Sequence, residues 1–198
     1  MIETKNLNDA IYLSAVKRIA ELAGSSEPVL IAIDGRCGSG KYTMGQWMQE
    51  HFDCNLFHMD DFYLPFAKRI PGWEKIASAN MDLSRFLEQV IIPVKRGEQV
   101  AYKAYNAHKD LYVFSLMELK QLNIVEGSYC HHPSLRREYD MTIFLTCEVA
   151  EQEARLRARE GDHFQSYQDR WIPLEESYFK RFAVEEKSDL VIHTDPET

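Results

Sequence analysis

The stretch from residue 29 to residue 43, which reads VLIAIDGRCGSGKYT, constrains the fold of this chain most strongly. An apolar, β-branched run of strand length breaks at a glycine-rich turn, and the turn leads into a segment of helical character. The turn has the spacing G-x-x-x-x-G-K, from Gly35 to Lys41. In such a loop, successive backbone N–H groups and the positive end of the following helix point at one place, and the lysine adds a cation. The stretch therefore predicts a phosphate-binding loop between a strand and a helix.

The rest of the chain alternates between strand-like and helix-like segments, and its 198 residues suit a single domain over residues 1–198. Together with the phosphate-binding loop, the alternation predicts an α/β protein of the P-loop NTPase fold: a five-stranded parallel sheet with helices on both faces. Strands are expected from residue 29 up to the glycine-rich turn and at 54–59, 122–125, 141–146 and 190–193. Helices are expected at 7–22, 82–94, 148–160 and after Pro173. A small hairpin is expected from residues 99–105 and 111–114, inside an acceptor-side insertion over about residues 65–115.

The charge balance and the lack of long apolar runs exclude several classes of protein. With 23 basic and 31 acidic residues, the formal charge of −8 argues against a general nucleic-acid binder, which would present a basic face. No apolar run reaches membrane-spanning length, and the first residues lack the order of a signal peptide. We therefore expect a cytoplasmic protein with neither nucleic acid nor a membrane among its partners.

The four cysteines, Cys37, Cys54, Cys130 and Cys147, lie far apart and form no C-x-x-C pair. This spacing indicates neither a disulfide framework nor a zinc ribbon. Reduced thiols, partly in the core, are the expected state. Cys130 is followed by two histidines, His131 and His132, but adjacent histidines without a distant partner are weak grounds for a metal site, and polar loop residues near the substrate are the preferred interpretation.

Acidic residues follow two of the expected strands. Asp60 and Asp61 come directly after 54–59, and Glu126 follows 122–125. Ligands of parallel sheets bind beyond the carboxyl ends of the strands, so these carboxylates should face the phosphate end of the loop. A plain turn or helix cap is the alternative for the two aspartates. Glu126 has the position of a carboxylate that binds Mg²⁺ directly or through water.

The helix expected at 148–160 carries three arginines at alternate positions. Arg155 and Arg159 share one face, whereas Arg157 points about 160° away from Arg155 at about 100° per residue. A solvated helix with Glu–Arg pairs would show this pattern. A helical lid over about residues 148–170, bringing positive charge to a triphosphate and excluding water, would show it as well. Spacing alone does not choose between the two.

Several short segments, taken together, are similar to one family of enzymes. Beside the phosphate-binding loop these are MDDFY at 59–63, NMD at 80–82, VEGSY at 125–129 and YDMTIFL at 139–145. With them the chain resembles the uridine kinase-like branch of the P-loop kinases, which is related to phosphoribulokinase and pantothenate kinase. The resemblance extends from about residue 29 to residue 193.

The resemblance implies roles for individual residues. Asp60 takes the place of the base that acts on the acceptor hydroxyl, and Asp82 that of the acid that contacts ribose hydroxyls. Catalysis is assigned to Asp60 and Lys41. The residues expected to bind ATP are Gly35, Cys37, Gly38, Ser39, Gly40, Lys41, Tyr42, Thr43, Arg155 and Arg159. Those expected to bind the acceptor are Asp60, Asp61, Tyr63, Asp82, Tyr105 and His108, and those expected to hold the metal are Glu126, Thr43 and Asp60.

These roles together predict a small-molecule kinase. It would use ATP and Mg²⁺ to phosphorylate a hydroxyl group of a small acceptor, a nucleoside such as uridine or cytidine. The sequence leaves the oligomeric state open, and a homo-oligomer is compatible with it.

Tyr42 departs from the expected pattern, because the residue after the lysine is normally Ser or Thr, whose hydroxyl meets Mg²⁺. A phenol carries its oxygen about 6.5 Å from Cα and does not fit that small space. Thr43 or water replaces the hydroxyl, or Glu126 and Asp60 hold the metal, or phosphoryl transfer is impaired. The alternative function is therefore a nucleotide-binding protein with weak or lost kinase activity.

Overall fold

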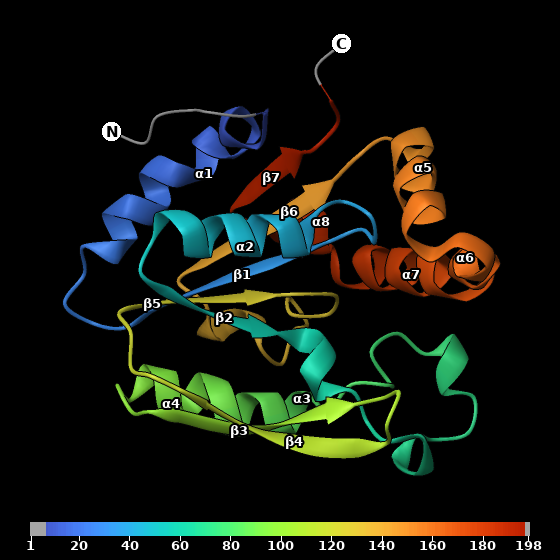
Figure 1. The fold of residues 1–198 in the computed structure, drawn as a ribbon, viewed down its shortest axis with the longest axis horizontal. Coiled ribbons are helices and arrows are strands. Elements are labelled where there is room, and N and C mark those ends of the chain that lie inside the picture. The colour runs from blue at the N-terminus through green and yellow to red at the C-terminus, as the bar shows by residue number, and fades with distance from the viewer. Residues whose placement is uncertain (1–6, 197–198) are drawn as a thin grey trace.

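A five-stranded sheet forms the centre of the molecule, in the order β2-β5-β1-β6-β7 (Figure 1). A computed structural model describes residues 7–196, and side chains from residue 11 onward. The strands are β1 (Val29–Gly35), β2 (Cys54–His58), β5 (Leu122–Glu126), β6 (Met141–Thr146) and β7 (Leu190–His193). All neighbours pair in parallel, with Ile31 opposite both Ile124 and Met141. The predicted five-stranded parallel sheet is confirmed.

Helices cover both faces of this sheet, as predicted. Alternate residues of β1 point to opposite faces: Ile31 and Ile33 enter the core under α1 (Leu7–Ala23) and α2 (Lys41–His51). Leu30 and Ala32 enter the core on the other face, where α3 (Leu83–Phe86), α4 (Ile92–Lys95), α7 (Ile172–Phe182) and α8 (Val184–Lys187) contribute side chains. Because both faces are buried, the strands read as continuous apolar runs.

Two of the helices contain a π-helical turn directly before an Ile-Pro pair. Residues 87–91 join α3 to α4 in this way, and residues 167–171 join α6 (Phe164–Ser166) to α7. Pro93 and Pro173 lack the N–H group that an α-helical bond requires, so the wider turn accommodates them. The helix predicted to start after Pro173 is therefore longer, since it runs on from α6.

The predicted hairpin is formed by β3 (Val100–Asn106) and β4 (Leu111–Met117), which pair antiparallel as a separate two-stranded sheet. It lies beside α4, at the lower edge of Figure 1. Val100 and Tyr102 of β3 are buried in the core, whereas β4 leaves large apolar side chains exposed, among them Phe114 and Leu116.

At the right of Figure 1, α5 (Val149–Glu160), α6 and α7 lie beyond the ends of β1 and β6.

All four cysteines are buried free thiols, as expected. None of the helices in the described residues is long and apolar enough to cross a bilayer.

Candidate active site

The loop between β1 and α2 has the geometry of a phosphate cradle. Gly38 and Gly40 have φ angles of 79° and 93°, which residues with a side chain rarely adopt. Gly40 precedes the first turn of α2, and no side chain caps that helix end, so its free N–H groups remain for a ligand. Lys41 Nζ donates to the carbonyls of Gly35 (2.6 Å) and Arg36 (3.1 Å). The predicted strand–loop–helix arrangement is confirmed.

A cavity of about 1100 Å³ opens at the carboxyl ends of the strands and is continuous with this loop. It is lined by residues of the loop, the turn after β2, the hairpin tip, the end of β5, and the helices α5 and α7. Most of the residues predicted for the site line it, namely Cys37, Gly38, Ser39, Gly40, Lys41, Tyr42, Thr43, Asp60, Asp61, Tyr63, His108, Glu126, Arg155 and Arg159.

Three predicted site residues do not line this cavity. A Cβ atom on Gly35 would lie 2.1 Å from the carbonyl oxygen of Leu145, so this glycine permits close packing of β1 on β6. Asp82 caps α3, because its Oδ1 accepts from the N–H of Arg85 (3.2 Å) while its Oδ2 pairs with Arg85 Nε (3.1 Å). The Tyr105 hydroxyl donates to Asp110 (2.7 Å) within the hairpin. The side chains of Asp82 and Tyr105 thus already have structural partners.

The acids at the ends of β2 and β5 face the same cavity. Burial and the charge of Glu126 raise the pKa of Asp60, and a hydrogen bond from Tyr63 and the charge of Lys41 offset part of that rise. Glu126 is buried, and its Oε1 lies 2.6 Å from Nδ1 of His58. This hydrogen bond raises the pKa of His58.

This pair of acids suits a divalent cation. A positive charge shared between two neighbouring carboxylates stabilises their charged forms. Among the described residues, no three His, Cys, Asp or Glu side chains gather closely enough to hold a metal alone. Mg²⁺ typically binds one or two carboxylates and completes its shell with water and phosphate oxygens, so Asp60 and Glu126 match its needs beside a nucleotide.

The Tyr42 side chain lies at the cavity wall with its hydroxyl turned along α2. The residue is 56% exposed, and its oxygen accepts a hydrogen bond from Gln46 Nε2 (2.9 Å) one turn later. Its ring lies 5.7 Å from the ring of His58. Tyr42 therefore packs against the residue that holds Glu126.

The arginines of α5 divide as their spacing predicts. Arg155 lines the cavity, and its Nη1 donates to the carbonyl of Gly38 (3.2 Å) and to Thr194 Oγ1 (2.9 Å). Arg159 also lines the cavity, with its guanidinium 5.7 Å from the ring of Tyr167. Arg157 lies outside, over Phe164. Arg155 thus connects α5 directly to the phosphate-binding loop.

Sequence reasoning missed Glu175, which lies on α7 and lines the cavity. Its Oε2 accepts from the backbone N–H of Cys37 (2.9 Å), and its Oε1 from the hydroxyl of Ser128 (2.5 Å). In the sequence Glu175 stands in an ordinary polar helix far from the loop, so no local signal marks it.

The interpretation of His131 as a polar loop residue near the substrate is wrong. The side chain is buried, and its Nε2 lies 3.2 Å from the carbonyl of Ala32. Burial lowers its pKa, which favours the neutral imidazole. His131 is therefore part of the packing beneath the sheet end.

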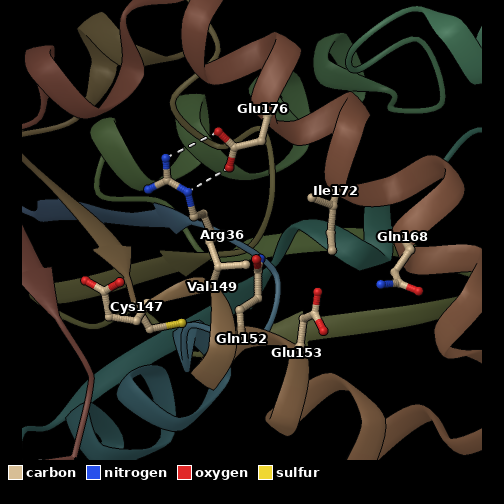
Figure 2. A pocket seen from close by; sticks show the side chains of 9 residues that line it. Arg36, Cys147, Val149, Gln152, Glu153, Gln168, Ile172 and Glu176 are labelled. Atoms are coloured by element: carbon tan, nitrogen blue, oxygen red, sulfur yellow. Dashed lines mark hydrogen bonds and ion pairs between the residues drawn. The ribbon is translucent and has the colours of Figure 1, made fainter.

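Arg36 lies within the loop motif but points away from the phosphate side. It lines a second, smaller cavity of about 430 Å³ between α5 and α7 (Figure 2). Its Nε pairs with Glu176 Oε1 (2.7 Å), and its Nη1 contacts Thr146 Oγ1 (2.7 Å) and Glu185 Oε2 (3.1 Å). The ion pair with Glu176 is drawn in Figure 2. Arg36 therefore anchors the loop from behind.

No protein-family model matches the sequence, and no curated protein does. Solved structures do match the fold. A protein from Silicibacter sp. TM1040 described as a candidate fructose transport system kinase aligns with a TM-score of 0.65 and 22% identity, covering 90% of this chain and 98% of its own. A possible uridine kinase from Bacillus stearothermophilus aligns with a TM-score of 0.60 and 19% identity over the same shares. The YGR205w protein aligns with a TM-score of 0.56 and 12% identity, and the alignment covers 94% of this chain and 92% of that protein. The chain therefore has the fold of P-loop kinases.

Proposed function

We propose that this protein transfers the γ-phosphoryl group of ATP to a hydroxyl group of a small molecule, with nucleosides such as uridine and cytidine as the first acceptors to test. One observation carries the proposal: a single cavity contains both the phosphate-binding loop with Lys41 and the carboxylate of Asp60. Its volume of about 1100 Å³ exceeds that of a typical site for one small ligand, about 300–1,000 Å³, and so leaves room for nucleotide and acceptor together.

Each group in the cavity has a task in this reaction. The N–H groups of Gly38 to Lys41 and the Lys41 ammonium bind the β- and γ-phosphates, and Arg155 and Arg159 bring positive charge from α5. Glu126 and Asp60 would hold Mg²⁺, which would supply positive charge to offset that of the phosphate oxygens. Thr43 also lines the cavity and brings a hydroxyl group to its wall.

Asp60 orients the acceptor and takes its proton. The acceptor oxygen forms a bond to the γ-phosphorus, the bond from that phosphorus to the β–γ bridging oxygen breaks, and the hydroxyl proton passes to the Asp60 carboxylate. A carboxylate held within hydrogen-bond reach of the acceptor hydroxyl orients that hydroxyl for in-line attack and accepts its proton.

A nucleotide-binding protein with weak kinase activity is the second candidate function. It is favoured by the orientation of Tyr42, whose hydroxyl is bonded to Gln46 and supplies no ligand near the loop. Both functions require nucleotide binding, so they differ only in turnover. Asp60 favours the kinase, because binding a nucleotide alone does not need a base in the cavity.

The expected cytoplasmic location and the absence of nucleic acid and membrane partners remain part of this proposal. A homo-oligomer would have to cover the exposed apolar side chains of β4, such as Phe114. Size-exclusion chromatography with light scattering measures that state directly.

The test is to incubate the protein with ATP, Mg²⁺ and a panel of nucleosides, sugars and pantothenate. We expect ADP formation that depends on one acceptor class. Asp60→Asn should lower kcat by about 10²–10⁴-fold while nucleotide affinity is retained. Asp53→Asn, which removes an exposed carboxylate that pairs with Lys120, is the matched control and should leave kcat unchanged. ADP formation no higher with any acceptor than without one would contradict the kinase proposal.

A further inference from the structure

One arginine of the cavity has no acidic partner. The guanidinium carbon of Arg69 lies 4.0 Å from the ring centroid of Phe66 and 4.5 Å from that of Trp73. Its Nε donates to the carbonyl of Leu64 (2.9 Å). Among the described residues, no carboxylate lies within ion-pair distance, and no hydrogen-bond acceptor is found for the two Nη atoms. The rings occupy the π faces of the guanidinium, so its Nη edge is left for a ligand.

A second unpaired donor belongs to the lining of the same cavity. Asn80 lines the cavity, is only 2% exposed, and its Nδ2 has no hydrogen-bond partner in the described part of the chain. Its backbone carbonyl accepts from the N–H of Leu64 (2.7 Å), and the carbonyl of the same Leu64 binds Arg69. Arg69 and Asn80 are therefore held on either side of one residue. A buried amide donor without a partner is costly unless a ligand satisfies it.

The other two arginines that line the cavity already have acidic partners. Arg155 pairs with Glu151 and Arg159 with Glu160, and both lie on α5. Arg69 instead follows the turn that carries Asp60 and Tyr63, on the acceptor side. Burial lowers the pKa of Arg69, and the charge of Glu74, which forms no ion pair with it, offsets only part of that shift. An anion on the acceptor would supply the missing charge.

We propose that Arg69 and Asn80 bind an anionic group of the acceptor, a carboxylate or a phosphate, while Asp60 faces its reacting hydroxyl. This inference rests on the proposed function and narrows its substrate class to hydroxyl compounds that carry a negative charge. The guanidinium fork offers two parallel N–H donors to such a group, and the Asn80 amide offers a third. A neutral acceptor would leave these donors without an ionic partner.

Binding of matched acceptor pairs tests the proposal without requiring turnover. The protein, saturated with Mg²⁺ and a non-hydrolysable ATP analogue, is titrated calorimetrically with pantothenate against neutral panthenol, and with uridine 3′-monophosphate against uridine. We expect the anionic member of at least one pair to bind about tenfold to a hundredfold more tightly. Carboxylate and phosphate are distinguished by which pair shows the preference.

Substitutions test which side chains produce the preference for an anionic acceptor. Arg69→Gln should abolish it while leaving the affinity for the ATP analogue unchanged, and Asn80→Asp should weaken anion binding by adding a like charge. Arg69→Lys keeps the charge without the fork and should retain part of the preference. Lys68→Gln removes an exposed cation next in the chain and should have no effect.

Three results would overturn the inference: equal affinity of the neutral members, no binding by any anionic member, or an undiminished preference in Arg69→Gln. An anionic compound that binds through Arg69 but is never phosphorylated would support the inference and contradict the proposed function. Phosphorylation of neutral nucleosides, with no preference for anionic acceptors, would support the proposed function and contradict the inference.

Discussion

At the scale of single residues, Tyr42 stands where the loop motif normally has a small hydroxyl. Its hydroxyl oxygen accepts a hydrogen bond from Gln46, and its ring packs near His58. His58 in turn is hydrogen-bonded to Glu126. Position 42 therefore offers no small hydroxyl, and Glu126 and Asp60 bring carboxylate oxygens to the same cavity. If Mg²⁺ binds as proposed, its protein ligands would therefore be carboxylates, with no hydroxyl from position 42 among them.

Tyr42→Thr tests whether this arrangement limits turnover. Threonine would place a hydroxyl where the loop motif normally has one, so we expect kcat to rise about 10- to 100-fold and the Mg²⁺ concentration for half-maximal rate to fall. Initial rates across a Mg²⁺ titration measure both. Gln46→Ala, which removes only the partner of the phenol, is the control. If both variants behave like the original protein, Tyr42 is not the impediment.

At the scale of elements, Asp189 fastens β7 to β6. Its Oδ2 accepts from both the backbone N–H (2.8 Å) and the hydroxyl (2.7 Å) of Thr142, and its own N–H donates back to that hydroxyl (3.1 Å). Burial raises the pKa of Asp189, but the two bonds from Thr142 outweigh it, and the pKa lies below the usual 3.8. The ionised carboxylate therefore stabilises the edge of the sheet.

The stability that Asp189 contributes should depend on pH. A carboxyl whose pKa is lower in the folded state stabilises the protein above its unfolded pKa, and that contribution is lost as pH falls through the folded pKa. We expect Asp189→Asn to lower the free energy of unfolding by about 1 kcal/mol at pH 7, because the side chain is 41% exposed. The difference should shrink below pH 3.8. Urea denaturation at several pH values measures it, with Asp162→Asn as an exposed control, and a pH-independent difference would refute this assignment.

At the scale of the whole molecule, Arg36 joins the phosphate-binding loop to the C-terminal helices. Its partners Glu176 and Glu185 belong to α7 and α8, and Thr146 ends β6. The loop is thus held from behind by segments that lie at the opposite end of the sequence. Loss of the Arg36 contacts should therefore weaken nucleotide binding and also lower the free energy of unfolding.

Arg36→Met tests that coupling. Removing the cation leaves two glutamates without their partner, and we expect a loss of about 1–3 kcal/mol in the free energy of unfolding together with weaker nucleotide binding. Arg157→Met removes a more exposed arginine, which pairs with Glu153 and lies over the ring of Phe164, so it should cost less than about 1 kcal/mol. Chemical denaturation and calorimetric titration with an ATP analogue measure the two effects. Equal losses in both variants would contradict the anchoring role.

Local patterns account for the parts of the molecule that the sequence could predict. The buried strands, the loop at 35–41 and the shared face of Arg155 and Arg159 follow from periodicities of two and 3.6 residues and from the needs of glycine-rich turns. The π-helical turns were missed, because a proline pattern that ends one helix can also be absorbed by a wider turn. The structural partners of Asp82 and Tyr105 were missed as well, since capping and hairpin bonds depend on side-chain positions that no spacing reveals.

The sequence by itself determined a parallel α/β sheet with a phosphate-binding loop at the carboxyl ends of its strands, because backbone geometry and burial impose recognisable patterns on neighbouring residues. Only the tertiary structure decided which distant side chains meet there. Glu175 reaches the N–H of Cys37 across 138 positions, and the backbone of Leu64 brings Arg69 beside Asn80. Such contacts arise from the packing of whole elements, and packing is set by the complete chain, not by any segment of it.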